Sequence, residues 1–234
     1  MKKKLLSTLM ATAMVLGLVG CGNASSTQTA SGSTSSTEAG TDGKVYHIGV
    51  CQLVEHEALD AATQGFQDAL KDKLGENNVV FDVQNAQGEE TNCATICTGF
   101  VSDNVDLILA NATASLQAAS AATNSIPIVG TSITDYATAL NADDWNGTSG
   151  TNITGTSDLA PLDQQEAMIK ELVPDVTQVG IVYCSAEANS VFQANQIEAA
   201  LEKDGIAYKE YSAADSNEIQ SVVTKAVSEC DCLY

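Results

Sequence analysis

The sequence predicts an α/β protein made of two lobes, each a doubly wound parallel sheet, with the second lobe truncated at the C-terminus. From residue 45 onward, short strand-like runs alternate with longer runs of helical periodicity, and this alternation is typical of βαβ units in a parallel sheet. The same order returns in the second half: Gly49 and Gly180 lie 131 residues apart, as do Leu70 and Leu201. A repeat of this kind indicates two lobes of one topology.

The first lobe is expected to span residues 44–155. Its elements in chain order are a strand at 45–51, a helix at 57–74, a strand at 79–84, a helix at 91–101, a strand at 105–110, a helix at 114–124 and a strand at 126–130. In the second of these helices, Cys93, Cys97 and Phe100 share one apolar face, because residues three and four apart lie on the same side of a helix. Thr113 and Asp135 stand where helices begin and are typical N-cap residues.

The second lobe, residues 156–234, is expected to repeat this pattern. Its elements are a strand at 178–184, a helix at 188–204 that Ser185 caps, a strand at 207–211, a helix at 217–229 and a last strand near 231. Residues 105–108 align with residues 230–233, so Tyr234 corresponds to Leu109 in the middle of a first-lobe strand. We therefore expect this chain to stop inside a buried strand. The alternative, a protein that ends there naturally, leaves a sheet with an exposed edge.

The first 43 residues carry the signals for export. Lys2, Lys3 and Lys4 precede an uncharged, mostly apolar run, and the run ends in a Leu-Val-Gly-Cys lipobox at Cys21. This pattern predicts a lipoprotein signal peptide at 1–20 and lipidation of Cys21; the alternative is an ordinary signal peptide or signal anchor with a chance cysteine. Residues 22–43 are rich in Ser, Thr and Gly, which predicts a flexible tether. The protein is therefore expected to be exported and anchored by lipid to a bacterial membrane, on the outer face of the cell membrane or in the periplasm.

The charge of the chain excludes one class of partner. Thirty acidic residues stand against ten basic ones, the formal net charge is -20, and all the basic residues are lysines. Binding to nucleic acid needs clustered basic side chains that neutralise phosphates, so no nucleic-acid partner is expected. Anionic lipid headgroups would also repel this chain, which leaves the lipid anchor as its expected membrane contact.

The remaining cysteines and the missing motifs argue against metal and catalytic sites. Free cysteine packs as a small apolar residue, which is the favoured role here, although a disulfide or a metal site is the alternative in an exported protein. The chain has two histidines and no C-x-x-C pair of zinc-ribbon spacing. It also lacks a phosphate-binding loop and a nucleophile elbow, so we expect no cofactor, metal or catalytic residue. The cysteines in question are Cys51, Cys93, Cys97, Cys184, Cys230 and Cys232.

Candidate ligand-binding residues lie at the carboxyl ends of the predicted strands. Open parallel sheets bind ligands beyond these ends, near helix N-termini, and in a two-lobed molecule the ends face a shared cleft. The loops concerned are rich in hydroxyl and carboxylate groups. The candidates are Gln52, Glu55, His56, Thr113, Ser115, Thr131, Thr134, Asp135, Ser185, Glu187, Asn189 and Ser190.

These residues suit an amino acid as ligand, although helix capping alone also accounts for several of them, and His56 reads as a cap or a binding contact rather than a general base. Because the chain has no arginine, a ligand carboxylate has to be held by helix N–H groups and hydroxyls. Glu55, Asp135 or Glu187 then meets an ammonium group. The combination indicates a zwitterion.

Several segments resemble the ABC transporter substrate-binding lipoproteins of the tryptophan/tyrosine type. They include IGVCQLVEHEALDAATQGFQDAL from residue 48, NAQG at 85–88, IPIVGTSITD from 126, NITGTSDLAPLDQQ from 152 and the SAEANS loop at 185–190. The resemblance implies a type I periplasmic-binding fold that closes over an aromatic or branched amino acid. It also implies delivery to an ABC permease and its ATPase. Family members often have proline after the caps, where this chain has Glu57, Ala114 and Tyr136.

Two other functions stay open at this point. A sensory lipoprotein of the same fold would pass ligand occupancy to a membrane signalling protein. A truncated surface lipoprotein would be inert and bind no small ligand.

Overall fold

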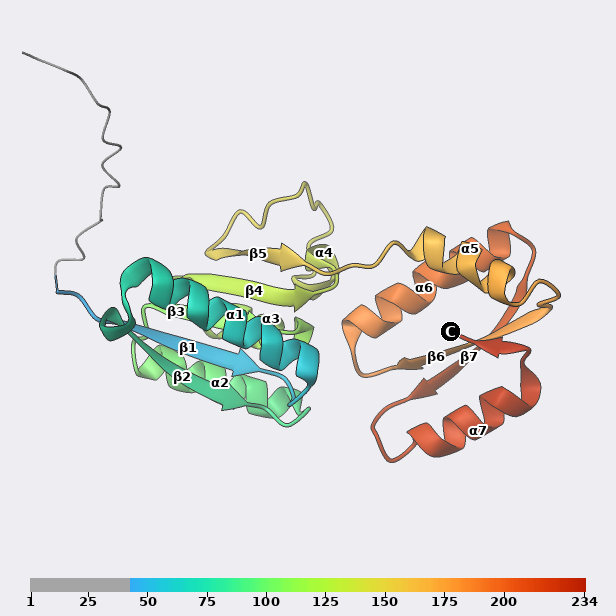
Figure 1. Cartoon of the computed structure of the whole chain (residues 1–234), viewed down its shortest axis with the longest axis horizontal. Helices are drawn as coiled ribbons and strands as arrows, with labels where there is room; N and C mark the ends of the chain where they lie inside the picture. The colour runs from blue at the N-terminus through green and yellow to red at the C-terminus, as the bar shows by residue number, and fades with distance from the viewer. Residues whose placement is uncertain (1–42) are drawn as a thin grey trace, which may run out of the picture. The chain divides into compact units, whose positions relative to one another are not determined.

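The computed structural model describes residues 43–234 (Figure 1). The predicted signal peptide, the lipidation residue Cys21 and the tether up to residue 42 lie outside the described residues.

The first sheet has five parallel strands in the order β2-β1-β3-β4-β5. Three helices and a short fourth one connect them, with a 3-10 turn at Glu76–Asn78 before β2. This is the doubly wound arrangement that the alternation predicts. The elements are β1 (Tyr46–Gln52), α1 (Glu57–Leu74), β2 (Val79–Asn85), α2 (Glu90–Ser102), β3 (Leu107–Asn111), α3 (Thr113–Ala122), β4 (Ile128–Ile133), α4 (Tyr136–Ala139) and β5 (Ile153–Ser157).

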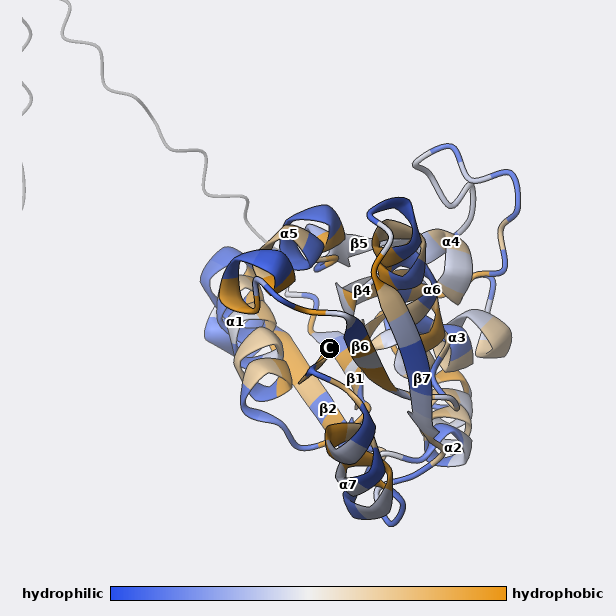
Figure 2. Cartoon of the chain, turned by 90° about the vertical axis from the view of Figure 1, so that its right-hand side faces the viewer, coloured by the Kyte–Doolittle hydropathy of each residue, from blue (hydrophilic) through white to orange (hydrophobic). Residues whose placement is uncertain are grey.

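Helices cover both faces of this sheet. α1 packs on one face through Phe66 and Leu70, while α2 and α3 pack on the other through Phe100 and Leu116. α1 is amphipathic, with hydrophilic residues on its outer side (Figure 2). Successive residues of a strand point to opposite faces, so a strand with helices on both sides is apolar throughout. β1, which is buried from Ile48 onward, has this character.

The second sheet has three parallel strands in the order β7-β6-β8. β6 lies between β7 and β8 as β1 lies between β2 and β3, which confirms the repeat. β6 is more hydrophobic than its neighbour β7 (Figure 2). The buried core around this sheet includes Val179 and Ile181 of β6 and Leu201 of α6. The elements are α5 (Leu162–Leu172), β6 (Gln178–Cys184), α6 (Ala188–Lys203), β7 (Ala207–Ala213), α7 (Ile219–Glu229) and β8 (Cys232–Leu233).

The glycine pair that revealed the repeat has a packing reason. A Cβ atom at Gly49 would lie 2.6 Å from ring atoms of Phe100, and one at Gly180 would lie 2.6 Å from Cδ2 of Leu233. Side chains essentially never approach a Cβ this closely. Glycine at this position of β1 and β6 therefore lets these neighbours pack directly over the strand.

Two elements in the middle of the chain were not predicted. β5 pairs with β4 and continues to Ser157, two residues beyond the suggested end of the first lobe. It was missed because only Ile153 of its five residues is buried, so β5 lacks the apolar run of the inner strands. α5 was missed as well, and its buried residue is the charged Glu166 rather than an apolar one.

The cysteines of the first sheet have the core role predicted for them. Cys51, Cys93 and Cys97 are free and fully buried between β1, α2 and α3. Cys184, Cys230 and Cys232 are free and half-buried.

Candidate ligand-binding site

The N-terminus of α3 has no side-chain cap. Its N-cap residue is Ala112, whose backbone has φ 96° and ψ 161° and whose side chain has no hydrogen-bonding atom. Helix starts leave their first N–H groups without intrahelical partners and carry a partial positive charge. The first turn of α3 therefore offers donors to a negatively charged ligand group.

Two other helices of the first sheet, α1 and α4, are capped by candidate residues, whereas α2 has no side-chain cap either. The backbone N–H of Ala58 donates to Nδ1 of His56 over 3.2 Å at the start of α1. At the start of α4, the N–H of Thr138 donates to Asp135 over 2.7 Å. These two caps confirm the expectation for His56 and Asp135.

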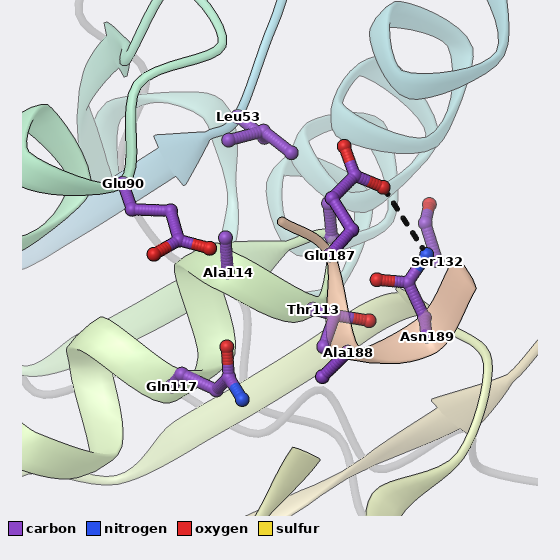
Figure 3. Close-up of a pocket in the computed structure, with 10 residues that line it drawn as sticks. Leu53, Glu90, Thr113, Ala114, Gln117, Ser132, Glu187, Ala188 and Asn189 are labelled. Carbon is purple, nitrogen blue, oxygen red and sulfur yellow. Dashed lines mark hydrogen bonds between the residues drawn. The ribbon is translucent and has the colours of Figure 1, made fainter. Parts of the chain in front are cut away.

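A small cavity of about 50 Å³ adjoins the uncapped end of α3 (Figure 3). Small-molecule sites usually have volumes of about 300–1,000 Å³, so this cavity has to widen to admit an amino acid. Its walls come from the loop after β1, the first turn of α2, α3, β4 and the start of α6. The lining residues are Leu53, Glu90, Ala112, Thr113, Ala114, Gln117, Ser132, Glu187, Ala188 and Asn189.

The cavity presents groups of both polarities. The donors of α3 and the nearly buried Thr113 lie on one side. Glu187, the N-cap residue of α6, supplies a carboxylate, and its Oε2 accepts a long hydrogen bond from Asn189 Nδ2 at 3.4 Å (Figure 3). It also accepts one from Ser190 Oγ at 3.3 Å. Glu90, in the first turn of α2, adds a second carboxylate. The lining residues include no lysine, so helix N–H groups and hydroxyls are its anion-binding groups.

Three of the candidate residues line this cavity, namely Thr113, Glu187 and Asn189. Two others lie beneath it rather than in it. Gln52 is buried and bonded to Asp60 and Thr63. Ser115 is fully buried, with its hydroxyl 3.6 Å from the thiol sulfur of Cys51 and 3.6 Å from that of Cys93.

The other candidates from the first sheet lie outside the lining. Glu55 is exposed. The carbonyl of Thr131 accepts the backbone N–H of Ala112 at 3.1 Å. The carbonyl of Thr134 accepts the hydroxyl of Ser157 at 2.9 Å.

Two of the predicted caps are wrong. α3 begins at Thr113 and its N-cap is Ala112, because β3 continues to Asn111 and leaves one residue for the turn. The N-cap of α6 is Glu187 rather than Ser185, because a turn closed by the Glu187 N–H and the Cys184 carbonyl comes first. Ser185 lines a neighbouring cavity of about 430 Å³, and Ser190 lines another of about 140 Å³.

Three polar residues of the lining were not predicted from the sequence, namely Glu90, Gln117 and Ser132. Glu90 follows the carboxyl end of β2, so the rule applied to the other strands would have included it. Gln117 lies one turn after Thr113 on the same face of α3. Ser132 lies in the loop expected after Gly130, from which Thr131, Thr134 and Asp135 were chosen instead; in the structure β4 continues to Ile133 through an irregular pairing in which Ser132 has φ 56°.

Comparison with known proteins identifies the family. The model of the family described as "ABC transporter substrate binding protein" matches residues 47–234. The chain belongs to this family. Its structural neighbours share the type I periplasmic-binding fold that the resemblance implies. Membership makes the chain a binding protein rather than an enzyme, and one that works outside the cytoplasm.

Three relatives illustrate the similarity. A tyrosine-binding protein from Clostridioides difficile (strain R20291) is 35% identical over 236 residues, which cover 99% of this chain and 67% of that protein. The crystal structure of a conserved domain protein from Vibrio cholerae O1 biovar eltor str. N16961 has 37% identity and a TM-score of 0.77, over 82% of this chain and 65% of that one. An ABC domain from Streptococcus pneumonia in complex with L-Trp has 35% identity and a TM-score of 0.73, over 80% and 63%.

The substrate-binding chain thus spans about two thirds of the length of these relatives. Among its described residues, the helices are too short or too polar to cross a lipid bilayer.

Proposed function

We propose that this substrate-binding protein captures an aromatic amino acid, tyrosine or tryptophan, and delivers it to an ABC permease driven by a cytoplasmic ATPase. The observation that carries the proposal is the uncapped N-terminus of α3, which adjoins the same cavity as the carboxylate of Glu187. Two relatives at 35% identity support the ligand class, one named for tyrosine binding and one crystallised with L-Trp.

The two poles of the cavity match the two charges of a free amino acid. The ligand carboxylate accepts N–H groups from the first turn of α3 and the hydroxyl of Thr113, where the helix dipole favours a negative charge. The ammonium group donates to Glu187, since hydrogen bonds between charged partners are the stronger kind. Neither contact needs an arginine.

The ligand side chain has room beside these poles. Ala188 lines both the small cavity and the neighbouring one of about 430 Å³, to which Phe192 also contributes. This hollow is wide open to solvent. An aromatic side chain directed past Ala188 would pack its ring against Phe192 there, and closure of the lobes would then cover it.

Transport follows from closure. The lobes at 44–155 and 156–234 move apart to admit the ligand and close on it, because a ligand that contacts both lobes stabilises the closed state. The permease then recognises that state. Lipid on Cys21 keeps the protein at the membrane, and the tether after it lets the lobes reach the permease.

Calorimetric titration of the full-length mature protein tests the proposal. Tyrosine, tryptophan, phenylalanine, leucine and a panel of sugars are the ligands. We expect saturable binding of one aromatic amino acid with a Kd in the micromolar range or below. We also expect Glu187→Gln to weaken binding at least about tenfold, which corresponds to about 1.4 kcal/mol.

Glu171→Gln is the matched control, since Glu171 is an exposed carboxylate of α5 that lines no described cavity. Binding of a sugar but no amino acid would overturn the ligand class. No binding at all would favour a sensory or an inert lipoprotein.

A further inference from the structure

A chain of buried polar side chains lies beneath the cavity. Gln52 and Asn111 are the last residues of β1 and β3 and are paired in the sheet. Both are bonded to Thr63 of α1: the Thr63 hydroxyl donates to Gln52 Oε1 at 2.7 Å and accepts from Asn111 Nδ2 at 2.9 Å. All three are nearly inaccessible, with exposures of 5%, 0% and 6% for Gln52, Asn111 and Thr63. One hydroxyl therefore joins two strand ends to a helix.

Further bonds fix the same three elements. Gln52 Nε2 donates to Asp60 Oδ1 at 2.6 Å and to the Val54 carbonyl at 2.9 Å. Asn111 Nδ2 also donates to the Leu59 carbonyl at 2.8 Å. Asn111 Oδ1 is buried without a hydrogen-bond partner, but the other polar atoms named here are bonded, and because an unpaired buried polar group is costly these bonds have few alternative arrangements.

The residue after this network has an unfavourable backbone conformation. Ala112 follows Asn111 and has φ 96°, a region that residues other than glycine rarely adopt. Such a conformation persists only where the surroundings impose it. The backbone on either side is held by Leu53 N–H to the Asn111 carbonyl at 3.2 Å and by Ala112 N–H to the Thr131 carbonyl at 3.1 Å. The first bond of α3 follows at once, from Leu116 N–H to the Ala112 carbonyl at 3.1 Å.

We propose that Thr63 is a positioning residue of the ligand site, which acts through Gln52 and Asn111 to fix the Asn111–Ala112 turn and so aims the N-terminus of α3 into the cavity. The inference rests on the proposed function for its effect on ligand binding. Thr63, Gln52 and Asn111 do not line the cavity, so their influence is indirect. The network leaves the N–H groups of α3 free for the ligand, because it orients the helix without capping it.

The test compares two substitutions of Thr63 in the full-length protein. Thr63→Val keeps the shape of the side chain and removes the hydroxyl, whereas Thr63→Ser keeps the hydroxyl. We expect Thr63→Val to raise the Kd for the amino acid about tenfold, and Thr63→Ser to stay within about twofold of the wild type. Rescue by serine separates the hydroxyl from a general packing effect.

Ile128→Val is the control for lost stability. Ile128 is fully buried at the amino end of β4, opposite to the strand ends that carry the network. We expect this variant to keep the wild-type Kd. If Thr63→Val binds as tightly as the wild type, or if Ile128→Val weakens binding equally, the inference is wrong while the proposed function stands.

A second measurement does not depend on the ligand. Hydrogen exchange of the Leu116 amide reports the turn directly, because this N–H closes on the Ala112 carbonyl. We expect Thr63→Val to speed this exchange at least about tenfold more than Ile128→Val does. If the wild type binds none of the ligands tested, the proposed function fails, and equal exchange in the two variants would then overturn the role of Thr63 as well.

Discussion

Asp106 and Asp231 make the same contact in the two halves of the protein. Each carboxylate accepts the backbone N–H of a residue at the start of β1 or β6, from His47 at 2.9 Å and from Gln178 at 2.9 Å. In return, the backbone N–H of Asp106 donates to the His47 carbonyl at 2.7 Å, and that of Asp231 donates to the Gln178 carbonyl at 3.0 Å. The repeat thus extends from the order of the elements to single hydrogen bonds.

These contacts predict that the protein loses stability in acid. The bond from Lys44 and the N–H of His47 hold the pKa of Asp106 below its usual range, and bonds from Thr177 and Gln178 do the same for Asp231. The unfolded chain therefore binds protons at a higher pH than the folded one, so these groups stabilise the fold above the ordinary pKa of about 4 and lose that effect as the pH falls below it. Urea unfolding between pH 3 and pH 7 measures this dependence. The double variant Asp106→Asn and Asp231→Asn should flatten it, and an unchanged slope would contradict the assignment.

The effect of a substitution at Ala112 on the free energy of unfolding should depend on the backbone conformation that the new residue tolerates, not on its polarity. Ala112→Val places a β-branched residue at φ 96°, which is strongly disfavoured, and should lower the free energy of unfolding by about 2 kcal/mol or more. Ala112→Gly should stay within about 1 kcal/mol of the wild type, since glycine adopts this conformation readily. Denaturant unfolding compares the two. Equal destabilisation by valine and glycine would show that the turn is not strained.

Gly49→Ala should destabilise the first sheet by about 1–3 kcal/mol, the usual cost of overpacking a core. Its new methyl group would meet the Phe100 ring at 2.6 Å. Gly65→Ala is the matched control, because a Cβ atom there meets nothing within 4 Å and Gly65 lies within α1. Replacing a helical glycine by alanine is stabilising by about 0.5–1 kcal/mol. The opposite signs of the two changes, measured by thermal unfolding, distinguish close packing at Gly49 from a general effect of glycine replacement.

The buried thiols should resist alkylation in the native state. Contact with Cys93 lowers the pKa of Cys51, but contact with Cys97 and burial outweigh it and raise the pKa to about 12. Contact with Cys51 and burial also raise the pKa of Cys93. Since the thiolate is the reactive form, iodoacetamide at pH 8 should label Cys184 before Cys51, Cys93 and Cys97, and should label all four in urea. Peptide mass spectrometry reads the sites, and early labelling of Cys93 would contradict this packing.

Replacement of Cys21 tests the lipid anchor. The wild-type protein should fractionate with membranes, because a diacylglyceryl group holds a protein there more durably than one acyl chain. Cys21→Ser removes the thiol that would carry the lipid, so the variant should be found in the soluble fraction outside the cytoplasm. Membrane association of the variant would mean that another contact holds the protein.

The fold was largely predictable because its strands carry helices on both faces. Residues 57–74 and 178–184 were placed with the bounds that the structure has, since apolar periodicity and flanking turns are strong there. β5 and α5 were missed because they bury almost no apolar side chains. The apolar pattern that reveals buried elements was therefore absent from both, in β5 because it is an edge strand.

The candidate ligand site was predictable only at the level of strand ends. The rule for open sheets led to Thr113, Glu187 and Asn189, but it treats every polar residue of a loop alike. The rule therefore does not distinguish a residue that faces the cavity from Gln52, whose side chain is buried and bonded to Thr63. That difference depends on side-chain direction, which for Gln52 is decided by Thr63, a partner 11 residues away on α1.

A protein that works outside the cytoplasm is exposed to the pH of its surroundings. The uncapped start of α3 offers backbone N–H groups, whose charge does not change with that pH. Backbone amides neither gain nor lose a proton over the range in which proteins stay folded, whereas a histidine in their place would change charge near neutrality. The end of the site that would hold a carboxylate therefore consists of backbone N–H groups, which do not ionise. As long as the turn at Ala112 keeps its shape, this half of the recognition surface is the same in an acidic medium as in a neutral one.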